Sequence, residues 1–198
     1  MRILVTAFDP FGGFDTNSSL IVLNKLPDKV GEVCIDKLMI PTVFKESASV
    51  TWEKALETGA DAILSLGQAG GRVNITPEKI GINYADASIA DNKGVLCSGE
   101  SLSDGRDAYF SSLPVEKMVK RANEKGFNSA LSLSAGAFVC NSLLYLLLEK
   151  VEKEEKDIKV GFVHLPYATE QGMDGFSLDA DDMCNCVVEM IKVIGDNI

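Results

Sequence analysis

The chain has 198 residues, 46% of them hydrophobic and 24% charged, which is typical of a globular protein with one domain spanning residues 1–198. Its formal net charge of −10 argues against a nucleic-acid partner and against docking on an anionic membrane. The opening run Met1–Asp9 is too short for a signal peptide, and the apolar stretch Leu143–Leu148 is far shorter than the roughly 20 residues of a membrane span.

The five cysteines stand in a chain without a secretion signal. Disulfides form and persist mainly in oxidising compartments, so these residues are predicted to be free thiols. We therefore expect a cytoplasmic protein.

Apolar, β-branched runs alternate with segments of helical periodicity. In chain order, the sequence predicts a strand over Arg2–Phe8, a helix from Asn17 or Ser18 to Leu26, a strand over Glu32–Ile40, a helix over Phe44–Glu57 and a strand over Ala62–Leu66. There follow a helix over Val115–Ala122, a strand over Ser129–Leu133, a helix from Cys140 to about Glu154, a strand over Lys159–Leu165 and a helix over Met183–Ile194.

This alternation predicts an α/β fold with three layers, α/β/α, in which helices cover both faces of a mostly parallel twisted sheet. The strands are nearly continuous in hydrophobicity, as expected of strands that are buried on both faces. The exception is Gly67–Ser112, which lacks helical periodicity. It is predicted to be an inserted irregular segment with short strands or a hairpin, and segments of this length are usually functional.

The only histidine, His164, stands at the C-terminal end of a predicted buried strand. A buried histidine is often a hydrogen-bonded core residue. However, ligands of open α/β sheets bind outside the carboxyl ends of the strands, and a hydrolase working at neutral pH needs a base that titrates near 7. His164 is therefore a candidate general base.

Cys140 follows a strand and begins a predicted helix, after the small residues Ser134, Ala135 and Gly136. Unpaired amides and positive potential at a helix N-terminus favour a thiolate. The alternative is that Cys140 is simply a small core residue, as we interpret Cys34. The strand–turn–helix setting makes it a candidate nucleophile.

A carboxylate is the third group that such a site needs, because it orients the imidazole. Residue types alone do not select one of the 29 acidic residues, although Glu78 stands out because apolar residues flank it within the irregular segment. Cys184 and Cys186 point to different faces of a helix and make a poor metal pair. We therefore expect no metal and no cofactor.

Five motifs together resemble the pyroglutamyl peptidase I family, also called pyrrolidone-carboxylate peptidases. They occur in the family's order and lie at Val5–Gly13, Gly67–Arg72, Pro77–Glu78, Ser134–Asn141 and His164–Tyr167. The resemblance covers nearly the whole chain. It implies a cysteine peptidase (a hydrolase and thiol protease) that removes an N-terminal pyroglutamyl residue, with Cys140 as nucleophile, His164 as base and Glu78 as the acidic member.

The resemblance also implies a pocket for the pyroglutamyl ring and an assembly. The implied pocket positions are Phe8, Phe11, Thr42, Gln68, Ile89 and Phe138. A neutral lactam suits an apolar slot between aromatic rings with a few hydrogen bonds. Similar enzymes are often homotetramers in the cytoplasm, so the expected partners are a pyroglutamyl-peptide substrate and copies of the same chain.

The sequence departs from the family pattern near the expected site. Ser88 replaces an arginine that the family commonly has, Leu96–Cys97 replaces a Gln-Pro pair, and Ser18 stands where the family has proline. Three alternatives therefore stay open: a homologue that binds pyroglutamyl groups with little turnover, a cysteine amidase for another small acyl group, and a protein in which Cys140 and His164 are structural.

Overall fold

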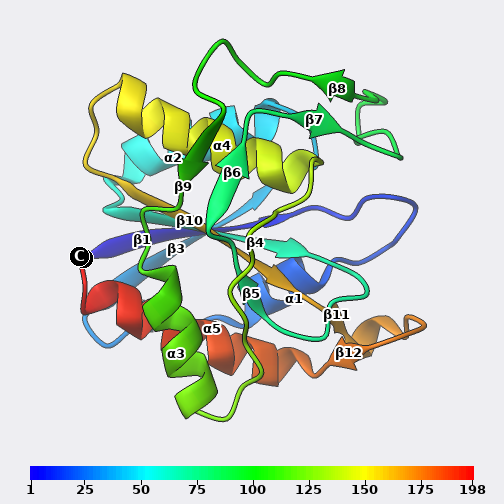
Figure 1. The fold of residues 1–198 in the computed structure, drawn as a ribbon. Coiled ribbons are helices and arrows are strands. Elements are labelled where there is room, and N and C mark those ends of the chain that lie inside the picture. The colour runs from blue at the N-terminus through cyan, green and yellow to red at the C-terminus, as the bar shows by residue number, and fades with distance from the viewer.

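A computed structural model describes residues 1–198 and has a six-stranded sheet at its centre (Figure 1). The strand order is β2-β3-β1-β4-β10-β5. The strands span Lys29–Val30 (β2), Val33–Ile40 (β3), Arg2–Phe8 (β1), Ala62–Gln68 (β4), Lys159–Leu165 (β10) and Thr76–Pro77 (β5). The four long strands are parallel, and the two short edge strands pair antiparallel.

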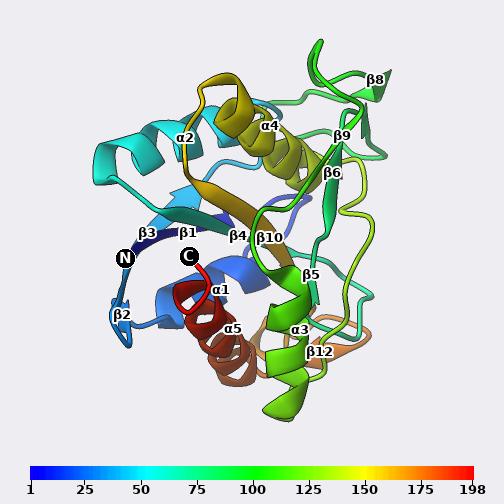
Figure 2. The same ribbon diagram turned by 60° about the vertical axis from the view of Figure 1, so that its left-hand side comes forward.

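Helices cover both faces of this sheet, and the predicted three-layer α/β fold is confirmed (Figures 1 and 2). One face is covered by α2 (Glu46–Thr58) and α4 (Val139–Lys153). The other is covered by α1 (Ser18–Lys25), α3 (Val115–Glu124) and α5 (Ala180–Gly195). None of these helices combines the length and hydrophobicity that crossing a bilayer requires.

Local sequence signals explain where the helices begin and end. The Asn17 side chain accepts a hydrogen bond from the amide of Ser19 and caps α1, as predicted. Asp179 caps α5 in the same way, with its carboxylate accepting from the amide of Asp181. Gly59 ends α2 in the left-handed conformation, with φ of 65°, which glycine adopts at little energetic penalty.

The segment Gly67–Ser112 forms β5 and two small antiparallel sheets beside the main sheet, in line with the predicted irregular insertion. β6 (Ile80–Ile82) pairs with β9 (Ala108–Phe110), and β7 (Ala85–Asp86) pairs with β8 (Ser98–Glu100). After β10 the chain forms β11 (Tyr167–Ala168), the 3₁₀ turn η1 (Thr169–Gln171) and β12 (Ser177–Leu178).

The predicted strand over Ser129–Leu133 is wrong. This segment makes only isolated bridges, from Ser129 to Ile75 and from Ser132 to Glu78. Leu131 and Leu133 are 38% and 71% exposed. Their apolar character suggested a buried strand, but no layer covers them, so the segment runs as an extended connection into α4.

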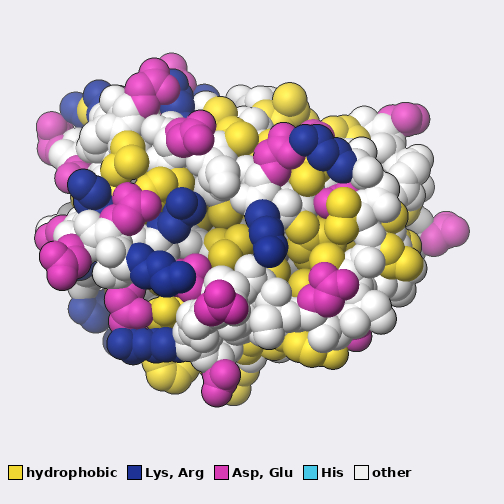
Figure 3. Space-filling view, turned by 90° about the horizontal axis from the view of Figure 1, so that it is seen from above, with side chains coloured by type: hydrophobic (Ala, Val, Ile, Leu, Met, Phe, Trp, Pro, Cys, Tyr) yellow, Lys and Arg dark blue, Asp and Glu magenta, His cyan; other side chains and the backbone are white.

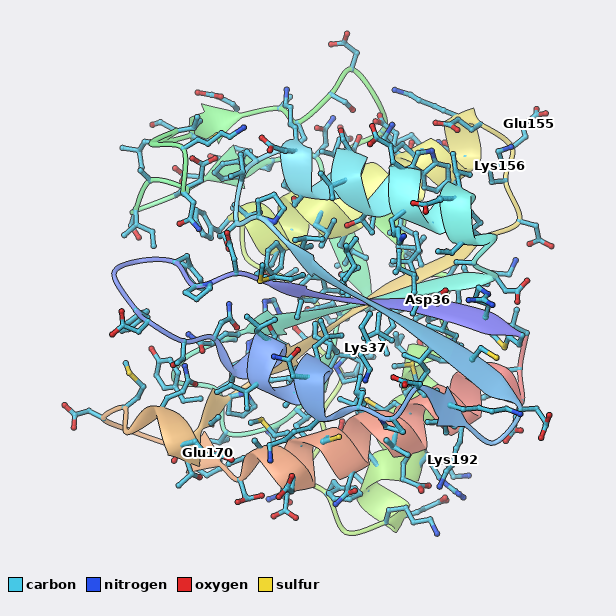
Figure 4. All side chains as sticks on the ribbon, turned by 180° about the vertical axis from the view of Figure 1, so that it is seen from behind. Asp36, Lys37, Glu155, Lys156, Glu170 and Lys192 are labelled. Atoms are coloured by element: carbon cyan, nitrogen blue, oxygen red, sulfur yellow. The ribbon has the colours of Figure 1, made fainter.

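The carboxyl ends of the parallel strands meet at one end of the molecule. In Figure 4, Glu155 and Lys156 lie at the end where β10 begins, and Glu170 lies beyond the end where it stops. Figure 3 views the α2/α4 side, where acidic and basic side chains are interspersed with hydrophobic ones and no histidine is visible. The single histidine is 4% exposed, so it lies beneath this surface.

Candidate active site

Cys140 is the second residue of α4, and its side chain is partly buried where that helix meets the sheet. The helix begins at this point because Gly136, with φ of 78°, redirects the chain, and Phe138 then has extended backbone. The Asn141 side chain holds the first turn in place: it accepts from the amide of Ile82 and donates to the carbonyls of Ile82 and Tyr84, each at 2.9 Å.

His164 lies near the C-terminal end of β10, as predicted, and its side chain points to the α2/α4 face. Its Nδ1 is 2.7 Å from Oε1 of Glu78. Because an ionised carboxylate only accepts hydrogen bonds, this contact requires a proton on Nδ1 and leaves Nε2 available as an acceptor. The ring also packs against Phe162, with 4.7 Å between ring centroids.

Gly67 explains how the sulfur approaches the imidazole. In the parallel pairing of β4 with β10, Gly67 is the direct neighbour of His164. A Cβ atom on Gly67 would lie 3.2 Å from Cys140 Sγ and 2.6 Å from the Phe162 ring. Because Gly67 has no side chain, the Cys140 sulfur can pack against β4 at this position. His164 lies on the adjacent strand, β10. No hydrogen bond joins the sulfur to the imidazole.

Glu78 is fully buried and follows the edge strand β5. Its amide donates to the carbonyl of Phe162 at 2.9 Å, which fixes it against β10. Its Oε1 accepts from Arg72 Nη1 at 2.7 Å as well as contacting His164. Its Oε2 has no hydrogen-bond partner.

Arg72 is the residue of this cluster to which the sequence analysis assigned no role. The available signal was an arginine six positions before Glu78 in an irregular segment. Such spacing has no fixed meaning outside a helix, so only the loop conformation places the guanidinium at the carboxylate.

Burial shifts the pKa values of the candidate nucleophile and the candidate base. It raises the pKa of the Cys140 thiol to about 12, and the Glu78 carboxylate adds to this effect. Burial also lowers the pKa of His164, although the hydrogen bond that its Nδ1–H donates to Glu78 opposes the shift. The helix N-terminus was expected to favour a thiolate. Desolvation acts in the opposite direction, and both shifts favour a neutral thiol beside a neutral imidazole.

Phe11 and Phe138, two of the six predicted pocket residues, are in contact. A third, Ile89, lies near the turn that follows Phe11. The rings of Phe11 and Phe138 are 6.0 Å apart between centroids, and Phe44 packs edge-on against Phe138 at 5.4 Å. Ile89 is 45% exposed, and its Cδ1 would lie 3.7 Å from a Cβ atom on Gly12. Of the six predicted residues, Phe11 and Phe138 are therefore in ring contact, and Ile89 lies near Gly12, the residue after Phe11.

The other three predicted pocket residues have side chains engaged in the fold. Phe8 is 2% exposed and packs against Phe162. Thr42 Oγ1 donates to the Asp9 carboxylate at 2.7 Å. The Gln68 side-chain oxygen accepts from the amide of Ser18 at 2.8 Å and from Gln171 Nε2 at 2.9 Å.

Ser88 lies in an exposed loop, and no contact in the structure explains its replacement of arginine. The loop that contains Ser88 is held in place by hydrogen bonds to Asp91, three residues further along the chain. Asp91 accepts from the amides of Phe44, Lys93 and Val95 at 2.9 to 3.0 Å. Burial alone would raise the pKa of Asp91, yet these amide hydrogen bonds hold it below its ordinary value.

No group of three or more His, Cys, Asp or Glu residues is arranged to hold a metal ion. All five cysteines are free thiols. The chemistry that this arrangement can perform is therefore that of a thiol, an imidazole and a carboxylate: nucleophilic attack with proton transfer.

Comparison with known proteins decides the family. A family model described as pyroglutamyl peptidase matches residues 1–195. The chain belongs to the pyroglutamyl peptidase family.

Individual relatives agree with this assignment. The chain is 45% identical over 194 residues to the pyrrolidone-carboxylate peptidase of Streptococcus suis, covering 98% of this chain and 90% of the relative. It is also 45% identical over 172 residues to that of Clostridium botulinum, covering 86% of this chain and 81% of the relative. The crystal structure of Bacillus amyloliquefaciens pyroglutamyl peptidase I superposes with a TM-score of 0.95 at 36% identity, covering 99% of this chain and 97% of that one.

These matches confirm both the resemblance and the fold class. As a pyroglutamyl peptidase, the chain is a cysteine peptidase and hydrolase. The assignment of individual residues to steps of the reaction rests on the geometry described above and is taken up next.

Proposed function

We propose that Cys140, His164 and Glu78 are the catalytic residues with which this pyroglutamyl peptidase removes the N-terminal L-pyroglutamyl residue from peptides. The observation that carries the proposal is the packing of the Cys140 sulfur against Gly67, which is the direct neighbour of His164 in the sheet. The buried Glu78 holds the other side of the imidazole at 2.7 Å. This is the order nucleophile, base and orienting acid that acyl transfer requires.

The first half of the reaction forms a thioester. Cys140 Sγ attacks the pyroglutamyl carbonyl carbon while its proton passes to His164 Nε2. The raised pKa of the thiol makes this transfer part of the attack rather than a step before it. The tetrahedral intermediate then breaks its carbon–nitrogen bond, and Nε2 returns the proton to the leaving amine.

The second half releases pyroglutamate. Water attacks the thioester carbonyl as His164 Nε2 takes one of its protons. The carbon–sulfur bond breaks and the proton returns to Cys140 Sγ. Glu78 stabilises the imidazolium that exists in both halves and keeps its proton on Nδ1.

The start of α4 is the proposed site for the developing oxyanion. The first amides of a helix have no acceptor within it, and no side chain caps this helix at Phe138. The amides of Val139 and Cys140 therefore remain available close to the attacking sulfur. Preorganised amide donors of this kind stabilise the oxyanion of acyl transfer.

The pyroglutamyl ring is proposed to bind between the tilted rings of Phe11 and Phe138, with Ile89 at the rim. Pyroglutamate has no free amine, so an apolar slot suits it better than a charged anchor would. The Gln68 backbone is proposed to bind the lactam amide. Phe8 and Thr42, whose side chains are engaged elsewhere, support the pocket from behind.

A cytoplasmic location and a homotetramer are the remaining proposals. Five free thiols suit a reducing compartment. Several large hydrophobic side chains are exposed, among them Phe110 at 68% and Leu133 at 71%, and association between copies would cover such surface. Light scattering of the purified protein measures the assembly directly.

A substrate panel tests the proposed function. The purified protein is assayed with pyroglutamyl, prolyl and glutaminyl chromogenic amides. We expect turnover of the L-pyroglutamyl amide, complete inactivation by thiol alkylation and no effect of chelators. Binding of pyroglutamate without turnover, or preference for another acyl group, would contradict the proposal.

A further inference from the structure

Arg72 lies in the loop between β4 and β5 and contacts three groups around the candidate active site. Its Nη1 donates to Glu78 Oε1 at 2.7 Å and to Thr76 Oγ1 at 2.5 Å. Its Nη2 donates to the carbonyl oxygen of Ser134 at 3.0 Å. None of the reaction steps above uses this residue.

The first consequence concerns charge. Glu78 has no exposed surface, and a buried carboxylate is strongly unfavourable unless it is paired and hydrogen-bonded. The charged groups that act on His164 are Glu78 and Arg72, and the Cys140 thiol packs against Gly67 on the neighbouring strand. The neighbours of His164 in the sheet, Gly67 and Thr76, are uncharged. Arg72 is therefore the only permanent cation that compensates Glu78.

The second consequence concerns the proton on the imidazole. With Glu78 ionised, Oε1 accepts from Nδ1–H, and Nε2 is free to take the thiol proton. Without a nearby cation, the buried carboxyl group is stabilised by taking up a proton. It would then donate to Nδ1 and shift the ring proton to Nε2, where it blocks the base.

The third consequence concerns the nucleophile. Ser134 precedes Cys140 in the extended connection that enters α4. Backbone hydrogen bonds hold this connection on either side of Ser134, at Ser132 and at Ala137. Ser132 Oγ donates to the same Ser134 carbonyl at 3.1 Å. The planar guanidinium of Arg72 thus hydrogen-bonds both to Glu78 and to the segment that leads to Cys140, and it fixes their relative positions.

We propose that Arg72 is a positioning residue of this site: it keeps Glu78 charged, so that His164 carries its proton on Nδ1, and it holds the segment leading to Cys140. This inference rests on the proposed function for its catalytic meaning. The part of the inference that concerns the tautomer of the His164 imidazole can be measured without any substrate.

The chain makes this measurement direct, because His164 is its only histidine. Protein labelled with ¹⁵N in histidine gives one pair of ring-nitrogen resonances, which report the tautomer. In the unsubstituted protein we expect Nδ1 protonated and Nε2 unprotonated at neutral pH. In Arg72→Met we expect the proton to move to Nε2 in half or more of the molecules.

Arg72→Lys separates the two contributions. Lysine retains the charge but offers no planar fork for two acceptors. We expect it to retain the Nδ1 tautomer. With a pyroglutamyl amide, kcat should fall on the order of 10²-fold in Arg72→Met and roughly tenfold in Arg72→Lys, with KM changed less than threefold in both.

Arg121→Met is the matched control, because Arg121 pairs with Glu189 at 2.8 Å far from the site. We expect it to keep both the tautomer and kcat. If Arg72→Met does not fold, Arg72→Gln replaces it as the neutral variant. A folded neutral variant whose imidazole keeps its proton on Nδ1 overturns the inference whatever its activity. Absence of turnover in the unsubstituted protein contradicts the proposed function instead.

Discussion

On the face of the sheet covered by α1, α3 and α5, β10 contributes Val163 and Leu165 to a core of apolar side chains. On the other face the same strand presents Phe162 and then His164. Successive residues of a strand point to opposite faces. Val163 and Leu165 therefore pack in one core, while Phe162 and His164 face the other side of the sheet. One face holds a hydrophobic core alone, whereas the other combines a core with the proposed active site at its carboxyl end.

The glycines of the two faces make the same contrast. Gly67 in β4 leaves space for the Cys140 sulfur, whereas Gly161 in β10 leaves space for Leu113 on the opposite face. Both sites are tightly packed, but only one of them borders the reactive groups. Substitutions matched across the sheet should therefore separate losses of activity from losses of stability.

The largest difference is expected between two thiols that lie on opposite faces of the sheet, Cys140 and Cys186. Cys140→Ala should lower kcat/KM for a pyroglutamyl amide by on the order of 10⁴-fold or more, because no other group supplies the nucleophile. Cys186→Ala, on the α1/α3/α5 face, should keep kcat and lose about 1 kcal/mol of unfolding free energy. Steady-state assays and urea denaturation measure the two effects. Activity retained in Cys140→Ala would remove the distinction between the faces.

Glu78→Gln should have the next largest effect. The amide keeps the size of the side chain but not its charge, so the imidazolium loses its stabilising partner, and kcat should fall about 10³-fold. Glu189→Gln is the control, since Glu189 also pairs with an arginine but lies on α5. Equal kcat in both variants would mean that Glu78 serves only the fold.

Gly67→Ala compared with Gly161→Ala tests the packing directly. The new methyl group would lie 2.6 Å from the Phe162 ring in the first and 2.7 Å from Leu113 in the second. Both should lose about 1–3 kcal/mol of unfolding free energy from overpacking. Only Gly67→Ala should also lower kcat, on the order of 10²-fold, because the sulfur is displaced. A similar kcat for the two variants would show that the sulfur does not depend on this space.

The smallest expected effect is that of pH. The pKa of His164 lies below its ordinary value of 6.5 because burial disfavours the charged form. The neutral imidazole is the active form, so kcat/KM should fall about tenfold per pH unit only below a midpoint under 6.5. Burial raises the pKa values of both Cys140 and Cys186 to about 12, so the imidazole alone distinguishes the reactive thiol.

Alkylation of Cys140 by iodoacetamide, followed across pH, measures the same protonation independently. Its rate should rise steadily with pH through the neutral range. A rate that stays constant from mildly acidic to neutral pH would reveal a preformed thiolate–imidazolium pair and contradict the assignment of a neutral pair.

The elements with strong local signals were predictable. Hydrophobic runs located four of the strands, Asn17 located a helix start, and the alternation of strands and helices indicated the fold. His164 was predictable as a candidate because a histidine at the end of a buried strand is unusual. The same kind of signal failed at Ser129–Leu133, since an apolar run does not reveal whether a layer will cover it.

By itself, the sequence determined the layers, the placement of Cys140 at a helix start and, through its motifs, the family. Only the tertiary structure decided that the carboxylate of Glu78 is buried against His164, that Arg72 pairs with it, and that burial raises the pKa of the Cys140 thiol. The physical reason is distance along the chain. Hydrophobic periodicity acts over a few residues, whereas His164 and Glu78 are 86 positions apart and meet only when the sheet and its edge segment have formed.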